Sequence, residues 1–170
     1  MIKFTDDKEQ IISLWRSVFS EDSREDVLFF LDECKNAECL GYFEENQLVS
    51  MLFLVDCCYS DLKGKYVYAV CTNQEFRNKG YSSCLINEAK KHKNDFLWLI
   101  PAHDSLFDFY AKFGFETKLH SDKAYENQIH FNENNEIIEY LYSGSDYTYP
   151  DGMVYSIKDF PVGNTGFILK

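Results

Sequence analysis

The chain has 170 residues, of which 45% are hydrophobic and 26% are charged. This length and composition are sufficient for a single domain with one substantial core, and they argue against general disorder. A formal net charge of −11 argues against a general nucleic-acid binder, because contacts with phosphate groups need a basic surface. No basic segment precedes a long apolar run at the N-terminus, and no stretch approaches the length of a membrane span, so we expect a cytoplasmic protein without a membrane partner.

Two amphipathic helices are predicted near the N-terminus, because apolar residues recur there at helical spacing. These residues are Ile11, Leu14, Trp15 and Val18 in the first helix, and Val27, Phe30, Leu31 and Cys34 in the second. Asp6 and Glu9 resemble a capping box at the start of the first helix.

Strands are predicted in the next part of the chain. The apolar, β-prone segments 39–43 and 48–59 flank a polar turn at 44–47, which is typical of a hairpin. A second turn is expected at Lys63-Gly64, before a strand over 66–72.

Helices and strands then alternate. The segment after Gly80 is predicted to be a helix, and 96–100 a short strand buried on both faces. Asp104 is expected to cap the next helix, which stops at Gly114 ahead of a strand over 115–119.

A second hairpin is expected from segments 129–131 and 137–141, followed by a last strand over 153–157. The order of elements predicts class α+β with a mixed sheet. The expected organisation is a single domain over 1–170, with a core at about 1–120 and an insertion plus closing strand at 121–170.

Six cysteines are present, but no pair has CxxC spacing, so a zinc site is not expected. A chain of this size without a secretory signal usually keeps its thiols reduced. Cys57 and Cys58 lie inside an apolar run. We therefore expect the cysteines to be small core residues and expect no metal.

Charge is unevenly distributed along the chain. The segment from Lys63 to Lys93 has seven basic and two acidic residues, whereas the remainder has 10 basic and 26 acidic residues. A polyanionic ligand would explain this basic segment. Its last three lysines have a second explanation, because lysines also stabilise the C-terminus of a helix.

The segment 70–82, Val-Cys-Thr-Asn-Gln-Glu-Phe-Arg-Asn-Lys-Gly-Tyr-Ser, carries the strongest functional signal. A strand runs into a turn, a glycine allows close approach to the backbone, and a helix begins at once. The N–H groups at such a helix start, together with Arg77 and Lys79, predict an anion site. A Walker A loop and a G-x-G-x-x-G dinucleotide loop are disfavoured, because neither pattern is present.

Two motifs make the sequence resemble the GNAT superfamily of acetyl-coenzyme A (acetyl-CoA)-dependent N-acetyltransferases. Arg77, Gly80 and Ser82 match the family pattern Q/R-x-x-G-x-G/A, with serine in place of the usual glycine or alanine. Segment 109–115, Phe-Tyr-Ala-Lys-Phe-Gly-Phe, is similar to the family's helix ending Y-x-K-x-G-F. The resemblance covers about 2–120. It implies a GNAT-like, largely antiparallel central sheet flanked by helices, with a C-terminal extension.

The resemblance also implies a binding site for acetyl-CoA as cosubstrate. Backbone groups of Val70 and Thr72 would pair with the pantetheine arm, and backbone N–H groups from Asn78 to Ser82 would hold the pyrophosphate. The implied cofactor-binding residues are Val70, Cys71, Thr72, Arg77, Asn78, Lys79, Gly80, Tyr81, Ser82 and His103. His103 stands where many members carry an asparagine that contacts the cofactor.

Tyr110 matches the family tyrosine that protonates the departing coenzyme A thiolate. A phenol suits this catalytic role, because it holds its proton at neutral pH. Packing is the alternative explanation, since Tyr110 lies between Phe109 and Phe113 on an apolar helix face.

The general base is not assigned by the sequence. An amine must lose a proton before it attacks a thioester, and Glu75, Asp56, Tyr68 and the acidic residues after His120 stay open for this role. Cys71 could act as a nucleophile in a ping-pong reaction, but no activating neighbour is identifiable in the sequence.

These observations predict an N-acetyltransferase that moves an acetyl group from acetyl-CoA directly to a primary amine of a small molecule or peptide. The alternative is a non-catalytic acyl-CoA-binding sensor or regulatory module, because fold analogy does not establish activity. The expected partners are acetyl-CoA and an amine acceptor, with no nucleic acid, and a homodimer stays open.

Overall fold

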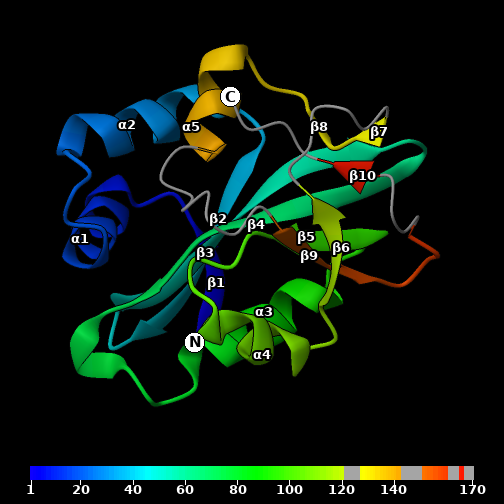
Figure 1. The fold of residues 1–170 in the computed structure, drawn as a ribbon. Helices are drawn as coiled ribbons and strands as arrows, with labels where there is room; N and C mark the ends of the chain where they lie inside the picture. The colour runs from blue at the N-terminus through cyan, green and yellow to red at the C-terminus, as the bar shows by residue number, and fades with distance from the viewer. Residues whose placement is uncertain (121–126, 143–150, 161–164, 167–170) are drawn as a thin grey trace. The chain divides into compact units, whose positions relative to one another are not determined.

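The computed structural model describes residues 1–120, 127–142, 151–160 and 165–166. The first of two compact units comprises Met1–Val55 and Val67–His92, and the second comprises Asp56–Tyr66 and the described residues from Lys93 onward. Figure 1 shows that each unit combines strands with helices. The predicted class, α+β with a mixed sheet, is confirmed.

The sheet of the first unit has the strand order β1-β2-β3-β4. Its strands are β1 (Ile2–Thr5), β2 (Ala37–Glu44) and the parts of β3 (Gln47–Tyr59) and β4 (Leu62–Thr72) that belong to this unit. β2 pairs antiparallel with both β1 and β3. Glu45 and Asn46 connect β2 to β3 with φ values of 46° and 69°, the left-handed backbone that a two-residue hairpin turn requires. The predicted first hairpin is confirmed.

Helices α1 (Lys8–Val18) and α2 (Arg24–Glu33) lie side by side in Figure 1 and pack on this sheet through one aromatic cluster. The Trp15 ring centroid lies 5.4 Å from that of Phe30 on α2, 5.7 Å from Phe53 on β3 and 5.8 Å from Tyr68 on β4. Both predicted helices are therefore present, with their apolar residues turned to the strands.

The start of α1 differs from the prediction by one residue. The Asp7 carboxylate, not that of Asp6, accepts a hydrogen bond from the backbone N–H of Gln10 at 3.2 Å. A capping side chain must reach the second or third N–H of the helix, and Asp6 precedes that position by one residue. A reciprocal capping box is present instead at α2, between Ser23 and Asp26.

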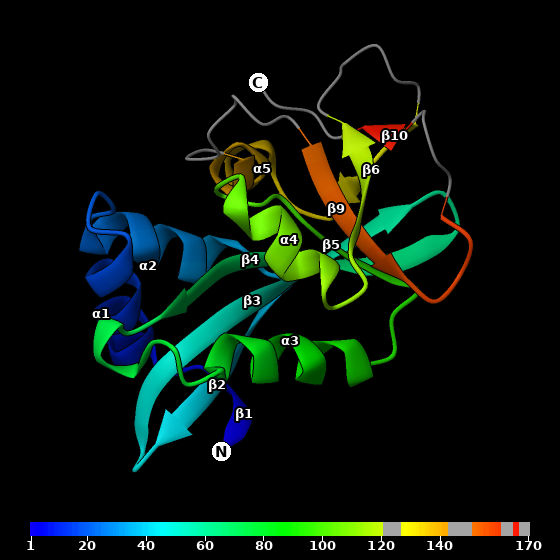
Figure 2. The same ribbon diagram turned by 60° about the horizontal axis from the view of Figure 1, so that its bottom comes forward.

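Helix α3 (Tyr81–Lys91) runs along the strands of the first unit in Figure 2. Leu85, Ile86 and Ala89 are buried, and the Tyr81 ring stacks on Tyr42 of β2 at a centroid distance of 4.1 Å. The predicted helix after Gly80 is confirmed, and its first residue is anchored to the sheet.

The second unit is built around β9 (Asp151–Ser156), which lies between β5 (Phe96–Leu99) and β6 (Glu116–His120) and is antiparallel to both. β5 also pairs with β4 in parallel. Each of these strands overlaps a predicted strand segment, including the last one over 153–157. Helix α4 (Ser105–Ala111) precedes β6, and Gly114 between them has φ 89°, as expected for the glycine after a helix.

The remaining described elements of this unit are short: β7 (Asn127–Gln128), β8 (His130–Phe131), α5 (Asn135–Tyr142) and β10 (Thr165–Gly166). The predicted second hairpin is wrong, because its second arm forms α5. The Asn134 side chain caps that helix by accepting from the backbone N–H of Ile137 at 2.9 Å. Ile137 and Leu141, one helical turn apart, are both buried.

The turn expected at Lys63-Gly64 is also wrong. β4 already begins at Leu62, and the turn lies at Ser60, which has φ 51°. Gly64 lies inside the strand opposite Phe96, and a Cβ there would come within 2.6 Å of the Phe96 ring and carbonyl oxygen. Close approach of two strands, not a turn, accounts for this glycine.

Two smaller predictions are corrected as well. Asp104 precedes α4, but its side chain makes no capping bond within the described residues. Cys34, Cys39, Cys57 and Cys71 are buried as expected, whereas Cys58 is half-buried and Cys84 is exposed on α3. No disulfide joins any two of these six cysteines, all of which lie in the described part of the chain.

Two absences concern the described residues alone. Nowhere among them do three or more His, Cys, Asp or Glu side chains gather as metal ligands would. None of their helices is long and apolar enough to cross a membrane.

Candidate functional site

The loop between β4 and α3 turns sharply just before the helix. Asn73 begins a short 3-10 helix, Gln74–Phe76, by accepting from the backbone N–H of Glu75 at 3.0 Å. Asn78 and Gly80 then adopt left-handed backbone, with φ 64° and 80°. Such residues let successive N–H groups point the same way, as they do in anion-binding nests.

Gly80 leaves the start of α3 open. It is the N-cap residue and has no side chain with which to bond the first N–H groups of the helix. A Cβ built at Gly80 would meet no atom within 4 Å, so the space beside this backbone is empty. The uncapped helix start therefore has both the donors and the room that a pyrophosphate requires.

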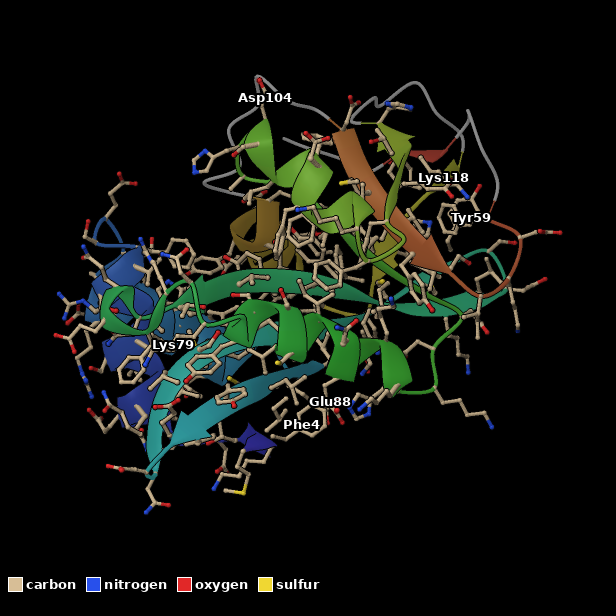
Figure 3. The ribbon with its side chains drawn as sticks, turned by 90° about the horizontal axis from the view of Figure 1, so that it is seen from below. Phe4, Tyr59, Lys79, Glu88, Asp104 and Lys118 are labelled. Carbon is tan, nitrogen blue, oxygen red and sulfur yellow. The ribbon has the colours of Figure 1, made fainter. Side chains whose placement is uncertain are left out.

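Two cations flank this helix start, and both are exposed. The Arg77 Nε donates to the carbonyl oxygen of Thr72 at 3.3 Å, and the Lys79 Nζ lies 4.9 Å from the centroid of the Phe76 ring. Figure 3 shows Lys79 on the loop and Glu88 farther along α3. At the other end of the helix, Lys91 pairs with Glu88 at 2.9 Å, so Lys79 and Lys91 lie at opposite ends of α3.

Three hydroxyl groups connect β3, β4 and α3. Ser50 is fully buried, its Oγ lies 2.8 Å from Thr72 Oγ1, and Thr72 Oγ1 lies 2.8 Å from Ser82 Oγ. Ser50 also donates to the carbonyl oxygen of Cys71 at 3.2 Å. This hydroxyl chain, Ser50-Thr72-Ser82, ties the end of the strand to the first turn of the helix. Sequence reasoning missed it, because its members are far apart in the chain.

The end of β4 has irregular backbone. Ala69 has φ 52°, a left-handed value that is unusual for a residue with a Cβ and interrupts the regular pleat of a strand. Val70 and Thr72 beyond it are half-buried, whereas Cys71 is buried. Burial raises the pKa of the Cys71 thiol well above its usual range, which disfavours the thiolate that a nucleophile needs.

The other two predicted site residues belong to the second unit. Tyr110 on α4 is 6% exposed and contacts the rings of Phe109 and Phe115 at 5.1 and 5.9 Å. Burial raises the pKa of its phenol to about 12. His103 is exposed before α4, and its carbonyl oxygen accepts from the N–H of Leu106 at 3.0 Å. The structure thus brings residues 70–82 together within the first unit and places His103 and Tyr110 at α4 of the second.

The candidate bases differ in their surroundings. Glu75 is exposed, Asp56 forms an ion pair with Lys65, and Tyr68 packs in the aromatic cluster of Trp15. Of the acidic residues after His120, Asp122, Glu126 and Asp146 lie outside the described residues. Asp151 is described, and its partner is His120, 31 positions away in the chain.

Fold and loop together define an α+β protein in which a strand leads into an uncapped, cation-flanked helix start. A sequence profile of the acetyltransferase (GNAT) domain matches residues 3–118. The chain belongs to this family of GNAT acetyltransferase domains. A search among curated proteins gave no significant match.

Solved structures share the fold at low sequence identity. An aminoglycoside 6'-N-acetyltransferase complexed with coenzyme A is 14% identical, with a TM-score of 0.61 over 95% of this chain and 99% of that one. A GNAT family acetyltransferase from Brucella melitensis in complex with acetyl-CoA is 12% identical, with a TM-score of 0.59 over 96% and 92%.

Other matched proteins are longer than this one. A probable N-acyltransferase from Enterococcus faecalis V583 is 17% identical, with a TM-score of 0.56 over 69% of this chain, which spans 32% of that protein. The chain spans 17% and 43% of two further matched proteins.

Proposed function

We propose that the chain is an acetyl-CoA-dependent N-acetyltransferase that transfers the acetyl group directly to a primary amine. The observation that carries this proposal is the open helix start at Gly80, in a chain of the GNAT acetyltransferase family. Two structures of the same fold hold coenzyme A or acetyl-CoA, which supports the pyrophosphate of acetyl-CoA as the anion that binds at this helix start.

The loop residues divide the binding of acetyl-CoA between them. N–H groups from Asn78 to Ser82 hold the pyrophosphate, while Arg77 and Lys79 add positive charge from flexible, exposed side chains. The end of β4, at Val70 and Thr72, offers backbone groups to the pantetheine arm, which then pairs like an added strand. The left-handed backbone of Ala69 supports this role, because it interrupts the regular pleat of the strand just before these residues.

Tyr110 supplies the proton that the departing thiolate needs. Its buried phenol keeps that proton across the physiological pH range, since burial raises its pKa to about 12. A thiolate next to an apolar wall is poorly solvated, so a proton donor there lowers the cost of breaking the carbon–sulfur bond. His103, exposed just before α4, is proposed to contact the cofactor.

Direct transfer is favoured over a covalent acyl-enzyme. The only cysteine in the loop segment 70–82 is Cys71, and its buried thiol with a raised pKa is a poor nucleophile. The acceptor is proposed to be a cationic amine, because the chain carries a net charge of −11. Its cytoplasmic location and a homodimer stay predictions.

Coenzyme A release from acetyl-CoA would test the proposal, with a panel of polyamines, aminoglycosides and lysine-containing peptides as acceptors. We expect release that depends on one class of amine and yields an N-acetylated product by mass spectrometry. Calorimetry with acetyl-CoA provides the second readout. Tight binding without release across the panel would favour a non-catalytic sensor, and absence of binding would overturn the assignment of the loop.

A further inference from the structure

A cavity of about 470 Å³ lies in the first unit. Its lining residues all belong to the segment Met1–Val55 and come from the end of β1, the start of α1, helix α2 and strands β2 and β3. Pockets that hold small molecules usually measure about 300 to 1,000 Å³, so this cavity has the size of a ligand site. The binding of acetyl-CoA, as proposed above, does not use it.

Apolar side chains form the floor of the cavity. Cys39 on β2 stands directly opposite Thr5 on β1 and Phe53 on β3 in the register, so these three side chains share one face of the sheet. Cys39 and Phe53 are buried, and burial raises the pKa of the Cys39 thiol to about 12, so the thiol stays neutral. Ile11 of α1 and Leu31 of α2 complete the apolar lining. This floor suits the hydrocarbon part of a ligand.

Charged side chains lie at the mouth of the cavity. Asp6, Lys8 and Glu38 line it, and all three are exposed. The charge of Lys8 is already compensated, because its Nζ lies 2.6 Å from the Asp32 Oδ1. The Asp6 carboxylate, in contrast, has no hydrogen-bond or ion-pair partner among the residues that the structure describes. Asp6 therefore offers a negative charge to a ligand.

The start of α1 does not turn the cavity into an anion site. A helix N-terminus attracts anions when its first N–H groups are free. Here the Asp7 carboxylate already accepts from the backbone N–H of Gln10 at 3.2 Å and from the side-chain amide of the same residue at 3.0 Å. Glu9 adds another negative charge to the first turn. The charges around the cavity therefore favour a cation.

The cavity is separate from the acetyl-CoA loop within the first unit. The loop joins β3 at Val49, whose carbonyl oxygen accepts from the backbone N–H of Asn73 at 2.9 Å. Phe53, on the floor of the cavity, lies four residues farther along β3. This separation corresponds to about 13 Å in a strand. A small molecule in the cavity therefore leaves the start of α3 open to acetyl-CoA.

We propose that this cavity binds a small organic ammonium ion, with its charged nitrogen at the Asp6 carboxylate and its apolar body against Cys39 and Phe53. Glu38 places a second carboxylate at the same mouth. The ligand is thus an amine with one apolar portion, and it binds at a second site besides the acetyl-CoA loop. This site does not depend on the proposed N-acetyltransferase function.

Calorimetry on the full chain without acetyl-CoA would test the site with three probes that share a phenyl ring. Phenethylamine is a cation at neutral pH, 2-phenylethanol is neutral and 3-phenylpropanoate is an anion. We expect saturable, one-to-one binding of phenethylamine. Its affinity should exceed that of 2-phenylethanol by about 5-fold, the upper range for an exposed ion pair. The anion should bind most weakly of the three.

Variants of the lining locate the bound probe. Asp6→Asn keeps the shape of the side chain and should remove the preference for phenethylamine over 2-phenylethanol. Glu33→Gln is the matched control, because it removes an exposed carboxylate at the end of α2 that does not line the cavity. Ala37→Phe should fill the cavity and abolish binding of all three probes, since Ala37 shares a face of β2 with Cys39. Acetyl-CoA affinity should be unchanged in each folded variant.

Three results would overturn the proposed site. The first is no saturable binding of phenethylamine to the parent, and the second is equal affinity of the parent for all three probes. The third is a preference for phenethylamine that persists in Asp6→Asn, which would place the amine elsewhere on the protein. This third result decides the matter even if Ala37→Phe does not fold. A parent that fails to bind acetyl-CoA would overturn the assignment of the loop and leave the ammonium site standing.

Discussion

Thr72 Oγ1 and Ser82 Oγ lie 2.8 Å apart, so a single pair of hydroxyls connects the last residue of β4 to the first turn of α3. The contact accounts for the serine that stands where GNAT members usually carry glycine or alanine. A small side chain is still present, and its hydroxyl has a partner. Buried Ser50 extends the link into the sheet, which fixes the helix start relative to the strand.

Removing the Thr72 hydroxyl should weaken the connection between the end of β4 and the start of α3. Thr72→Val keeps the shape of the side chain but leaves the hydroxyls of Ser50 and Ser82 without their shared partner. Because a lost hydrogen bond costs about 1 kcal/mol, we expect acetyl-CoA affinity to fall by roughly 5-fold, with less effect on kcat. Calorimetry measures the affinity. Thr72→Ser retains the hydroxyl and should bind like the parent, and equal losses in both variants would contradict a role for the hydroxyl.

The open space at Gly80 predicts the effect of a charge placed there. Gly80→Asp adds a carboxylate beside the proposed pyrophosphate position, where no atom lies within 4 Å of the new Cβ, so the fold should persist. Gly80→Asn is the matched control, because it has the same shape and the same tolerance of φ 80° without the charge. We expect both to weaken acetyl-CoA binding and the aspartate to weaken it by at least a further 10-fold. Indistinguishable dissociation constants for Gly80→Asp and the parent would mean that phosphate does not bind here.

Lys79 and Lys91 allow an electrostatic test on one helix. Lys79→Glu and Lys91→Glu change the net charge equally, but Lys79 precedes the start of α3 and Lys91 lies at its end, paired with Glu88. Salt screens the interaction between exposed charges. Lys79→Glu should therefore weaken acetyl-CoA binding more at low salt, about 20 mM, than at high salt, about 500 mM. Lys91→Glu should have little effect at either. Losses of the same size in both variants would indicate a general effect of net charge.

Accessibility of the thiols predicts their order of reaction. Cys84 is exposed on α3, whereas Cys71 is buried and the pKa of its thiol is raised by that burial. Treatment of the native protein with iodoacetamide at pH 8 should modify Cys84 first and leave Cys71 unmodified until the protein unfolds. Peptide mass spectrometry locates the modification. Rapid, acetyl-CoA-protected labelling of Cys71 would reopen a covalent mechanism.

Local sequence patterns predicted an element well where apolar residues recur at a regular spacing and turn residues or a glycine mark where the element begins or ends. The hairpin of β2 and β3 and the helix after Gly80 both meet this condition, and both are confirmed. Prediction failed where one residue type serves two purposes. Gly64 was taken for a turn but is required by the close approach of Phe96, and Asn134 was taken for part of a hairpin turn but caps α5.

Long-range contacts in the candidate site could not be predicted in the same way. The motifs identified Gly80, Ser82 and Tyr110, because these residues have fixed spacing from the ends of elements. Neither the contact of Ser50 with Thr72 nor the pair of His120 with Asp151 leaves a local pattern, since strand pairing brings these residues together. The division into a core at about 1–120 and a closing insertion stays a prediction.

Tyr110→Phe tests the mechanism, because binding alone does not separate an enzyme from a sensor. The change keeps the ring that packs against Phe109 and Phe115 and removes the proton proposed for the leaving thiolate. Turnover with an identified amine should fall by about 10²-fold, with little change in acetyl-CoA affinity. Phe109→Leu alters a neighbouring ring without touching the phenol and is the matched control.

The raised pKa of Tyr110 predicts that the free energy of unfolding falls at alkaline pH. Burial favours the neutral phenol, so the folded-state value of about 12 exceeds the unfolded value of about 10. The stability that this difference contributes is fully present below about pH 10 and is lost as the pH rises through about 12. The parent should therefore lose free energy of unfolding over this range more steeply than Tyr110→Phe, as chemical denaturation at each pH would measure. If Tyr110→Phe retains the turnover of the parent under conditions where chemistry limits the rate, Tyr110 is a packing residue and another group must protonate the thiolate.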